Sequence, residues 1–394
     1  MSRYTPQEQP QATMTARRRL TIGIPTPTHD RRLPLTPEAA EIITEYGIEV
    51  RIQRGAGALI NYPDTRYAAA GARIVERAEA LECDIVISCE MPRHDDIAKM
   101  RHGALLMTLY AQTHDAKIVK ALLQRHVSAI ALTRIADRNR RTPVADTLGE
   151  IAGRAAVTIA AARLAQVDAA TNVGKGILIG GVAGITPCEV TIFGSGIAAQ
   201  AAAASAAGIG ATVRMFDDDT YGLRNAVMHS GSPIICSSLQ PHVIRAAIAT
   251  ADIIIATPAA IPYELSAETL AHAKQGVLAY DITDSDVSPF RTFIDTDIAA
   301  TDSDTTSADR RCYRNLSAAV PRTTAMALSN AIVTLLPDII GTSNLGIASS
   351  LGTPNSGIDI RHALYTHMGH VTDPDLARIH SLPYLDIDIL ARLS

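Results

Sequence analysis

The chain is poor in cysteine and in aromatic residues: its 394 residues include 5 cysteines, 4 phenylalanines and no tryptophan. The cysteines are odd in number and scattered, at Cys83, Cys89, Cys188, Cys236 and Cys312. None forms a C-x-x-C pair, so the sequence predicts neither a disulfide framework nor a zinc site. We therefore expect a protein of the reducing cytoplasm that holds no metal ion.

The chain also lacks a charge excess and a long apolar run. Its 36 lysines and arginines against 40 aspartates and glutamates give a net charge of -4, which argues against a nucleic-acid partner. Glycine, serine or glutamine interrupts the apolar segments before the ~20 residues that span a membrane, so we expect no membrane partner. Residues 1–19 are polar and lack the apolar centre of a secretory signal, and we interpret them as a disordered tail.

Segments typical of β-strands alternate with segments typical of helices along the rest of the chain. Residues 20–25 and 48–53 are strand-like and flank a helix-like segment that begins near Thr36, which makes one β-α-β unit. Three more apolar runs follow, at 84–89, 104–110 and 128–133. A second series of such units begins near residue 188. This order predicts an α/β protein with two parallel sheets covered by helices.

Two segments rich in helix-forming residues separate these series. Residues 147–166 contain few helix breakers and many small residues, which predicts a long connecting helix that another helix can approach closely. A second long helix is expected to begin at Pro321 and to return the chain to the first domain. The acidic, threonine-rich residues 296–311 show no apolar periodicity, and we interpret them as a surface loop.

The strongest chemical signal is a glycine-rich turn between a strand and a helix. The apolar run at 190–193 leads into Gly194-Ser195-Gly196-Ile197-Ala198-Ala199, an alanine-rich helix and a strand that ends at Asp217. This order is typical of dinucleotide binding, with the pyrophosphate at the helix N-terminus and the acid on the ribose. The expected cofactor contacts are Gly194, Gly196, Ile197, Ala198 and Asp217. A carboxylate there favours NAD over NADP; the alternative is a Rossmann domain that has lost its cofactor.

Several segments together resemble the alanine dehydrogenase and nicotinamide nucleotide transhydrogenase family, in particular its alanine dehydrogenase branch. They are IGIPTPTHDRRLPLTP, RIQRGAGALINYPDTRYAAAGARIV, GEIAGRAA, GILIGGVAGITPCEVTIFGSG, ATVRMFDDDTYGLR and NLSAAVPRTTAMALSNA. The resemblance implies two Rossmann-like domains, with an NAD domain (147–322) inserted into a substrate domain (20–146 and 323–394). It also implies a site between the domains, a homo-oligomer ranging from dimer to hexamer, and interconversion of L-alanine with pyruvate and ammonia.

The resemblance assigns roles to three polar residues. Arg32 falls at the position that binds the substrate carboxylate, a task that suits the planar guanidinium fork. Arg224 and Asn315 fall at positions that contact the cofactor. Either of these two could instead be a structural hydrogen-bonding group.

The catalytic positions of the family are altered in this chain. Ser88 and Glu90 stand where the family has lysines, and no lysine precedes Lys99. Glu90 would therefore line the substrate site, where an unpaired carboxylate calls for a cationic partner.

The histidine and aspartate positions of the family are altered as well. Ala111 stands where the family has its histidine, and His114 is the nearby candidate for the catalytic role, with a surface or helix-capping role as the alternative. Ser285 stands where the family has its aspartate, and Asp284 or Asp286 could replace it.

These substitutions leave three hypotheses open. The first is an NAD-dependent oxidoreductase that acts on a small amino acid and keto acid pair with an altered pocket. The second is a catalytically silent NAD-binding homologue that serves as a subunit or sensor. The third is a specialised pathway enzyme whose cationic substrate pairs with Glu90.

Overall fold

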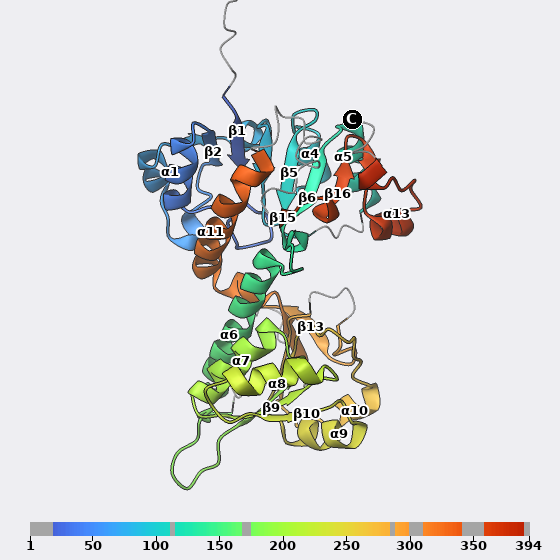
Figure 1. Cartoon of the computed structure of the whole chain (residues 1–394). Helices are drawn as coiled ribbons and strands as arrows, with labels where there is room; N and C mark the ends of the chain where they lie inside the picture. The colour runs from blue at the N-terminus through green and yellow to red at the C-terminus, as the bar shows by residue number, and fades with distance from the viewer. Residues whose placement is uncertain are drawn as a thin grey trace, which may run out of the picture.

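The computed structural model describes six stretches of the chain: residues 19–110, 115–167, 175–283, 288–298, 310–340 and 358–389. These residues form two lobes, each built around its own mostly parallel sheet (Figure 1). The predicted α/β class with two Rossmann-like sheets is therefore confirmed. The predicted tail lies outside the described residues except for its last position.

The sheet of the first lobe has eight strands in the order β3-β2-β1-β4-β5-β6-β16-β17. They are β1 (Thr21–Ile24), β2 (Glu49–Gln53), β3 (Arg73–Val75), β4 (Ile85–Ile87), β5 (Leu105–Thr108), β6 (Ser128–Ala131), β16 (Leu364–His367) and β17 (His370–Val371). Strands β1 to β6 are parallel, whereas β16 and β17 are antiparallel to their neighbours. The strand order reverses between β1 and β4, which makes the carboxyl ends of these two strands a topological switch point.

Helices cover both faces of this sheet, and its central strands are buried throughout. The helical segments are α1 (Pro37–Glu45), η1 (Ala58–Ile60), α2 (Asp64–Ala69), α3 (Arg77–Leu81), α4 (His94–Ile97), α5 (Ala116–Gln124), η2 (Leu132–Arg134), η4 (Arg361–Ala363) and α13 (Pro374–His380). A short antiparallel pair, β7 (Ala136–Asp137) with β15 (Ile358–Asp359), lies below it. Burial on both faces explains why β1 and β4 are continuous apolar runs rather than alternating ones.

The sheet of the second lobe has seven strands in the order β10-β9-β8-β11-β12-β14-β13, all parallel. The strands are β8 (Glu189–Phe193), β9 (Thr212–Phe216), β10 (Ile235–Ser237), β11 (Ile253–Ala256), β12 (Leu278–Asp281), β13 (Ile294–Asp297) and β14 (Arg311–Arg314). Helices α7 (Ile197–Gly208), α8 (Thr220–His229), α9 (Pro241–Thr250) and α10 (Ala267–Ala271) and the turn η3 (Leu316–Ala319) complete the lobe. Its switch point lies between β8 and β11, beside the glycine turn.

One expectation for this lobe was wrong at its two ends. The segment 296–311, interpreted as a surface loop, begins in β13 and ends on the first residue of β14, and these strands pair in parallel. Residues 299–309 lie outside the described part of the chain. Strand β13 is at the edge of the sheet and three of its four residues are exposed. An exposed edge strand needs no apolar side chains, so no periodicity marked it in the sequence.

Two long helices connect the lobes, α6 (Pro143–Ala165) and α11 (Pro321–Ile340) (Figure 1). Helix α6 confirms the predicted connecting helix, and it packs closely on α7 because Gly153 has no side chain. A Cβ atom on Gly153 would lie 2.3 Å from the carbonyl oxygen of Ala198. The expected domain limits at 146 and 323 fall inside these two helices and remain predictions.

Helix α11 is apolar for a structural reason. Within the described ranges it is the one helix that is long and apolar enough to cross a membrane. Its residues Leu328, Ile332 and Leu336 are buried in the core of the first lobe. Packing into the core of the first lobe therefore accounts for its composition.

Candidate functional site

The glycine turn after β8 is a close backbone junction that leaves the N-terminus of α7 accessible. Gly194 has a φ of 100°, and a Cβ atom there would lie 2.3 Å from the Oγ1 of Thr257. Gly196 is the N-cap of α7, and Ile197 at the first turn is 46% exposed. Backbone N–H groups at such a helix start are suited to bind a phosphate. The turn therefore fits the pyrophosphate of a dinucleotide.

Asp217, at the end of β9, faces this turn. Its carboxylate accepts a hydrogen bond from the Ser195 hydroxyl at 2.7 Å and one from the Asp219 N–H at 3.0 Å. The residue is 1% exposed. A carboxylate has about four acceptor positions, so two remain for the hydroxyls of a ribose. Asp217 thus combines a structural contact with the capacity to bind a ligand.

Gly222 lets α8 lie close to the glycine turn, beside Asp217. A Cβ atom on Gly222 would lie 2.1 Å from the Oγ of Ser195, so only glycine allows α8 this close to the turn. The two acids after Asp217 have structural roles, one in a helix cap and one in a turn. Asp219 caps α8 through the N–H of Tyr221, and Asp218 accepts the N–H of Leu239.

A pocket of about 570 Å³ opens at the carboxyl ends of β11 and β12. Its lining includes Thr257, Pro258, Tyr263, Glu264, Thr283 and Arg291. The pocket adjoins the glycine turn, because the carbonyl oxygen of Pro258 is 3.0 Å from where a Cβ of Gly194 would lie. Tyr263 donates to the carbonyl oxygen of Thr257 at 3.0 Å, and burial raises the pKa of its phenol. Tyr263 is therefore a neutral hydrogen-bond donor at neutral pH.

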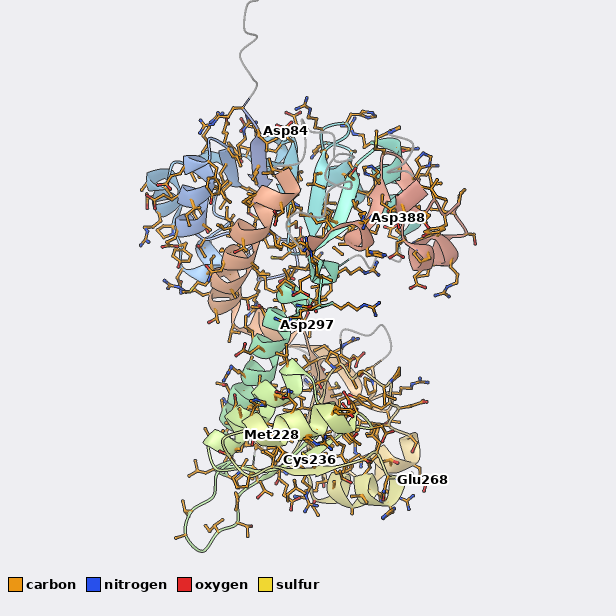
Figure 2. All side chains as sticks on the ribbon, in the orientation of Figure 1. Asp84, Met228, Cys236, Glu268, Asp297 and Asp388 are labelled. Atoms are coloured by element: carbon orange, nitrogen blue, oxygen red, sulfur yellow. The ribbon has the colours of Figure 1, made fainter. Side chains whose placement is uncertain are left out.

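The two other expected cofactor contacts lie at different places around this edge of the sheet. Arg224 is exposed on α8, with its guanidinium 5.5 Å from the ring centre of Tyr221. Asn315 follows β14 with a φ of 62° and donates to Asp297 at 3.5 Å. Asp297 lies at the junction of the two lobes (Figure 2). The cofactor roles of Arg224 and Asn315 remain predictions.

Arg32, the expected carboxylate-binding residue, is buried at the lobe junction. Its Nε lies 2.9 Å from both carboxylate oxygens of Asp30, and its Nη1 donates to Ser317 at 3.0 Å. The ring centre of Tyr110 is 5.8 Å from the guanidinium carbon. Burial acts to lower the pKa of Arg32, but the hydrogen bond and charge of Asp30 outweigh it and raise that pKa. Arg32 is thus a permanent cation with one fixed counter-ion.

Glu90 has partners that the sequence did not predict. Its carboxylate accepts the backbone N–H groups of Thr28, His29 and Asp30, the last two at 2.9 and 3.1 Å. These residues follow β1 and Glu90 follows β4, so the contact spans the switch point of the first sheet. Three N–H dipoles already stabilise the charge of Glu90. The geometry therefore does not require the cationic partner that we expected for it.

The candidates for the catalytic roles cannot be placed. Ala111 and His114 lie outside the described residues, as do Asp284, Ser285 and Asp286. Tyr110, the residue just before the first of these segments, lies beside Arg32. Thr283, just before the second, lines the pocket.

Sequence reasoning overlooked three residues that surround Arg32: Asp30, Tyr110 and Ser317. The acid two residues before Arg32 was a signal, because so short a loop can bring the two charges together. Nothing in the sequence linked Ser317 to Arg32, since 285 positions separate them.

Known proteins match this chain over most of its length. The family description "Alanine dehydrogenase/PNT, N-terminal domain" matches residues 24–153, and "Alanine dehydrogenase/PNT, C-terminal domain" matches residues 156–374. An alanine dehydrogenase of Mycolicibacterium smegmatis is 29% identical over 379 residues, which cover 93% of this chain and 98% of that protein. Alanine dehydrogenase 2 of Staphylococcus aureus is 29% identical over 378 residues, with the same coverage of each chain.

Solved structures share the fold. An L-alanine dehydrogenase superposes with a TM-score of 0.78 at 23% identity, covering 92% of this chain and 99% of that one. A transhydrogenase from Sinorhizobium meliloti has a TM-score of 0.69 at 20% identity, covering 90% and 99%.

Proposed function

The chain belongs to the alanine dehydrogenase/PNT family, and from this membership and the geometry above we propose an NAD-dependent oxidoreductase that interconverts a small amino acid and its keto acid. The observation that carries the proposal is the convergence of groups at one edge of the second sheet. The glycine turn, the pocket and η3 all follow the carboxyl ends of its strands, and Arg32 of the first lobe reaches η3.

The cofactor is NAD, held by the turn at Gly194 to Ala198 and by Asp217. When bound, NAD accepts or supplies the hydride. The start of α7 binds the pyrophosphate, and the Asp217 carboxylate binds the ribose hydroxyls while it repels a 2′-phosphate. The pocket at Thr257 and Tyr263, next along the sheet, would take the nicotinamide end.

Arg32 holds the substrate carboxylate against this edge. Asp30 binds the Nε and Nη2 of the guanidinium and Ser317 accepts from Nη1, which leaves one N–H on each terminal nitrogen for a ligand. A carboxylate bound there has its neighbouring carbon near the cofactor, and this orientation is the main contribution of the protein to hydride transfer.

The altered positions make L-alanine a poor substrate in this proposal. Glu90 replaces a cation of the family and is held by the loop that carries Asp30, so it cannot polarise a carbonyl oxygen. His114, with Asp284 or Asp286, remains the proposed source of acid and base catalysis. In this proposal the substrate pair therefore differs from alanine and pyruvate. The difference lies in the part of the substrate that contacts the loop carrying Asp30.

The silent NAD-binding homologue is the second candidate. It is favoured by one observation: Arg32 is only 4% exposed and already has Asp30 and Ser317 as partners. The cationic-substrate hypothesis has less support, because backbone N–H groups occupy both oxygens of Glu90.

We also propose a cytoplasmic homo-oligomer, from dimer to hexamer. Support comes from a protruding segment of the second lobe, in which Leu178, Val182 and Ile185 are 65%, 56% and 66% exposed. Apolar side chains exposed together favour a protein contact. Light scattering should give a multiple of the 41.8 kDa chain mass, and a monomer at every concentration would refute the proposal.

Two measurements test the main proposal. Calorimetric titration should give tighter binding of NADH than of NADPH. Formation of NADH should then be followed with L-alanine and a panel of other amino acids, and its oxidation with the matching keto acids and ammonium. Turnover of any pair supports the enzyme, whereas NADH binding without turnover of any pair supports the silent homologue.

A further inference from the structure

Arg32 and Ser317 form a buried hydrogen bond between the two lobes. Arg32 follows β1 in the first lobe, and Ser317 lies in η3, directly after β14 of the second lobe. The Nη1 of Arg32 donates to the Oγ of Ser317 at 3.0 Å, and the two residues are 4% and 5% exposed. A hydrogen bond to a charged group in such a place is strong and directional.

Ser317 is held between the start of α11 and the end of β14. Its carbonyl oxygen accepts the hydroxyl of Thr324 at 2.7 Å, and Thr324 is fully buried in the first turn of α11. On its other side, η3 begins at Asn315, the residue after β14. Ser317 therefore moves with the strand ends that carry the cofactor site.

Arg32 is held just as firmly on the side of the first lobe. Asp30 binds its Nε and Nη2, and the N–H of Asp30 is in turn held by Glu90. With Ser317 on Nη1, one N–H remains on each terminal nitrogen and can be donated to a carboxylate. The contact with Ser317 thus sets the direction in which this pair points.

We propose that Ser317 is a positioning residue that couples the cofactor lobe to the affinity of Arg32 for a substrate carboxylate. The inference rests on the proposed function, in which Arg32 binds that carboxylate. In this proposal, a shift of the second-lobe strand ends when NADH binds would reach Arg32 through the hydroxyl of Ser317. By linkage, a carboxylate on Arg32 strengthens NADH binding by the same factor.

The test compares Ser317→Ala with Ser317→Thr, which keeps a hydroxyl, and with Ser329→Ala as the matched control. Ser329 is 1% exposed and accepts the N–H of Thr36 at 2.8 Å, so its loss removes another buried bond between α11 and the first lobe. Calorimetry would give the Kd of NADH alone, and then the Kd of pyruvate, L-alanine and L-lysine with and without saturating NADH.

Ser317→Ala should bind NADH alone as the wild type does. It should bind the preferred probe about tenfold to a hundredfold more weakly in the presence of NADH, and the gain that NADH confers should disappear. Ser317→Thr should restore both, and Ser329→Ala should lower the Tm without changing either.

Two results would overturn the inference and can be told apart. If the wild type binds a probe and Arg32→Lys abolishes this binding, but Ser317→Ala behaves as the wild type or as Ser329→Ala, the inference alone is wrong. If the wild type binds NADH but none of the probes, the proposed function fails and the inference fails with it.

Discussion

Replacing Asp217 by alanine should impair both the fold and cofactor binding. The substitution leaves the Ser195 hydroxyl and the Asp219 N–H without the acceptor that they now have at 2.7 and 3.0 Å. An unsatisfied buried group costs about 1–3 kcal/mol and two groups lose their acceptor, so we expect the free energy of unfolding to fall by about 2–6 kcal/mol. The lost bonds to ribose, at about 0.5–1.5 kcal/mol each, should weaken NADH binding by about tenfold to a hundredfold.

Asp218→Ala is the matched control for this prediction. Asp218 is the adjacent acid, but it is exposed and accepts only the N–H of Leu239. Urea denaturation and NADH titration of both variants separate the two effects. If Asp217→Ala unfolds at the same urea concentration as Asp218→Ala, the buried bonds contribute nothing. If it also keeps the wild-type preference for NADH over NADPH, Asp217 does not contact the ribose.

Three further predictions concern packing, charge and the altered pocket. Gly153→Val should lower the free energy of unfolding by about 1–3 kcal/mol, because its Cβ would lie 2.3 Å from a main-chain oxygen of α7. Gly149→Ala, whose Cβ would make only a 3.4 Å contact, should be tolerated. Equal Tm values for the two variants would contradict this prediction. Burial acts to raise the pKa of Asp96, but the hydrogen bond and charge of Arg77 lower it below its ordinary value. The stabilisation from this ion pair is therefore complete above about pH 3.9 and is lost as the pH falls through the lower folded pKa of Asp96. Denaturation should show that the stability advantage of the wild type over Asp96→Asn shrinks in acid. An advantage that grows in acid would contradict this sign. Glu90→Lys should lower the Tm rather than restore alanine dehydrogenation, because lysine cannot accept the three N–H groups that Glu90 accepts. A stable variant that forms more NADH from L-alanine would show that Glu90 does not hold this loop.

The sequence by itself determined the class of the fold and predicted the place of the cofactor. Strands buried on both faces are mostly apolar, so β1, β4, β8 and β11 could be recognised one by one. The glycine turn could be recognised as well, because its requirements are local. Gly194 needs a positive φ and no side chain, and Asp217 lies one β-α-β unit further on.

The tertiary structure alone decided which strands lie at the sheet edges and which partners the charged side chains have. Strand β16 lies antiparallel beside β6 although more than 200 positions separate them, and the exposed edge strand β13 has no apolar pattern to reveal it. Glu90 aligns with a lysine of the family, yet its carboxylate accepts three backbone N–H groups. Arg32 meets Ser317 only because two separate sheets bring the ends of β1 and β14 together. A side chain shows in the sequence what it can bind, but its partner depends on contacts between distant segments, which form only when the chain folds.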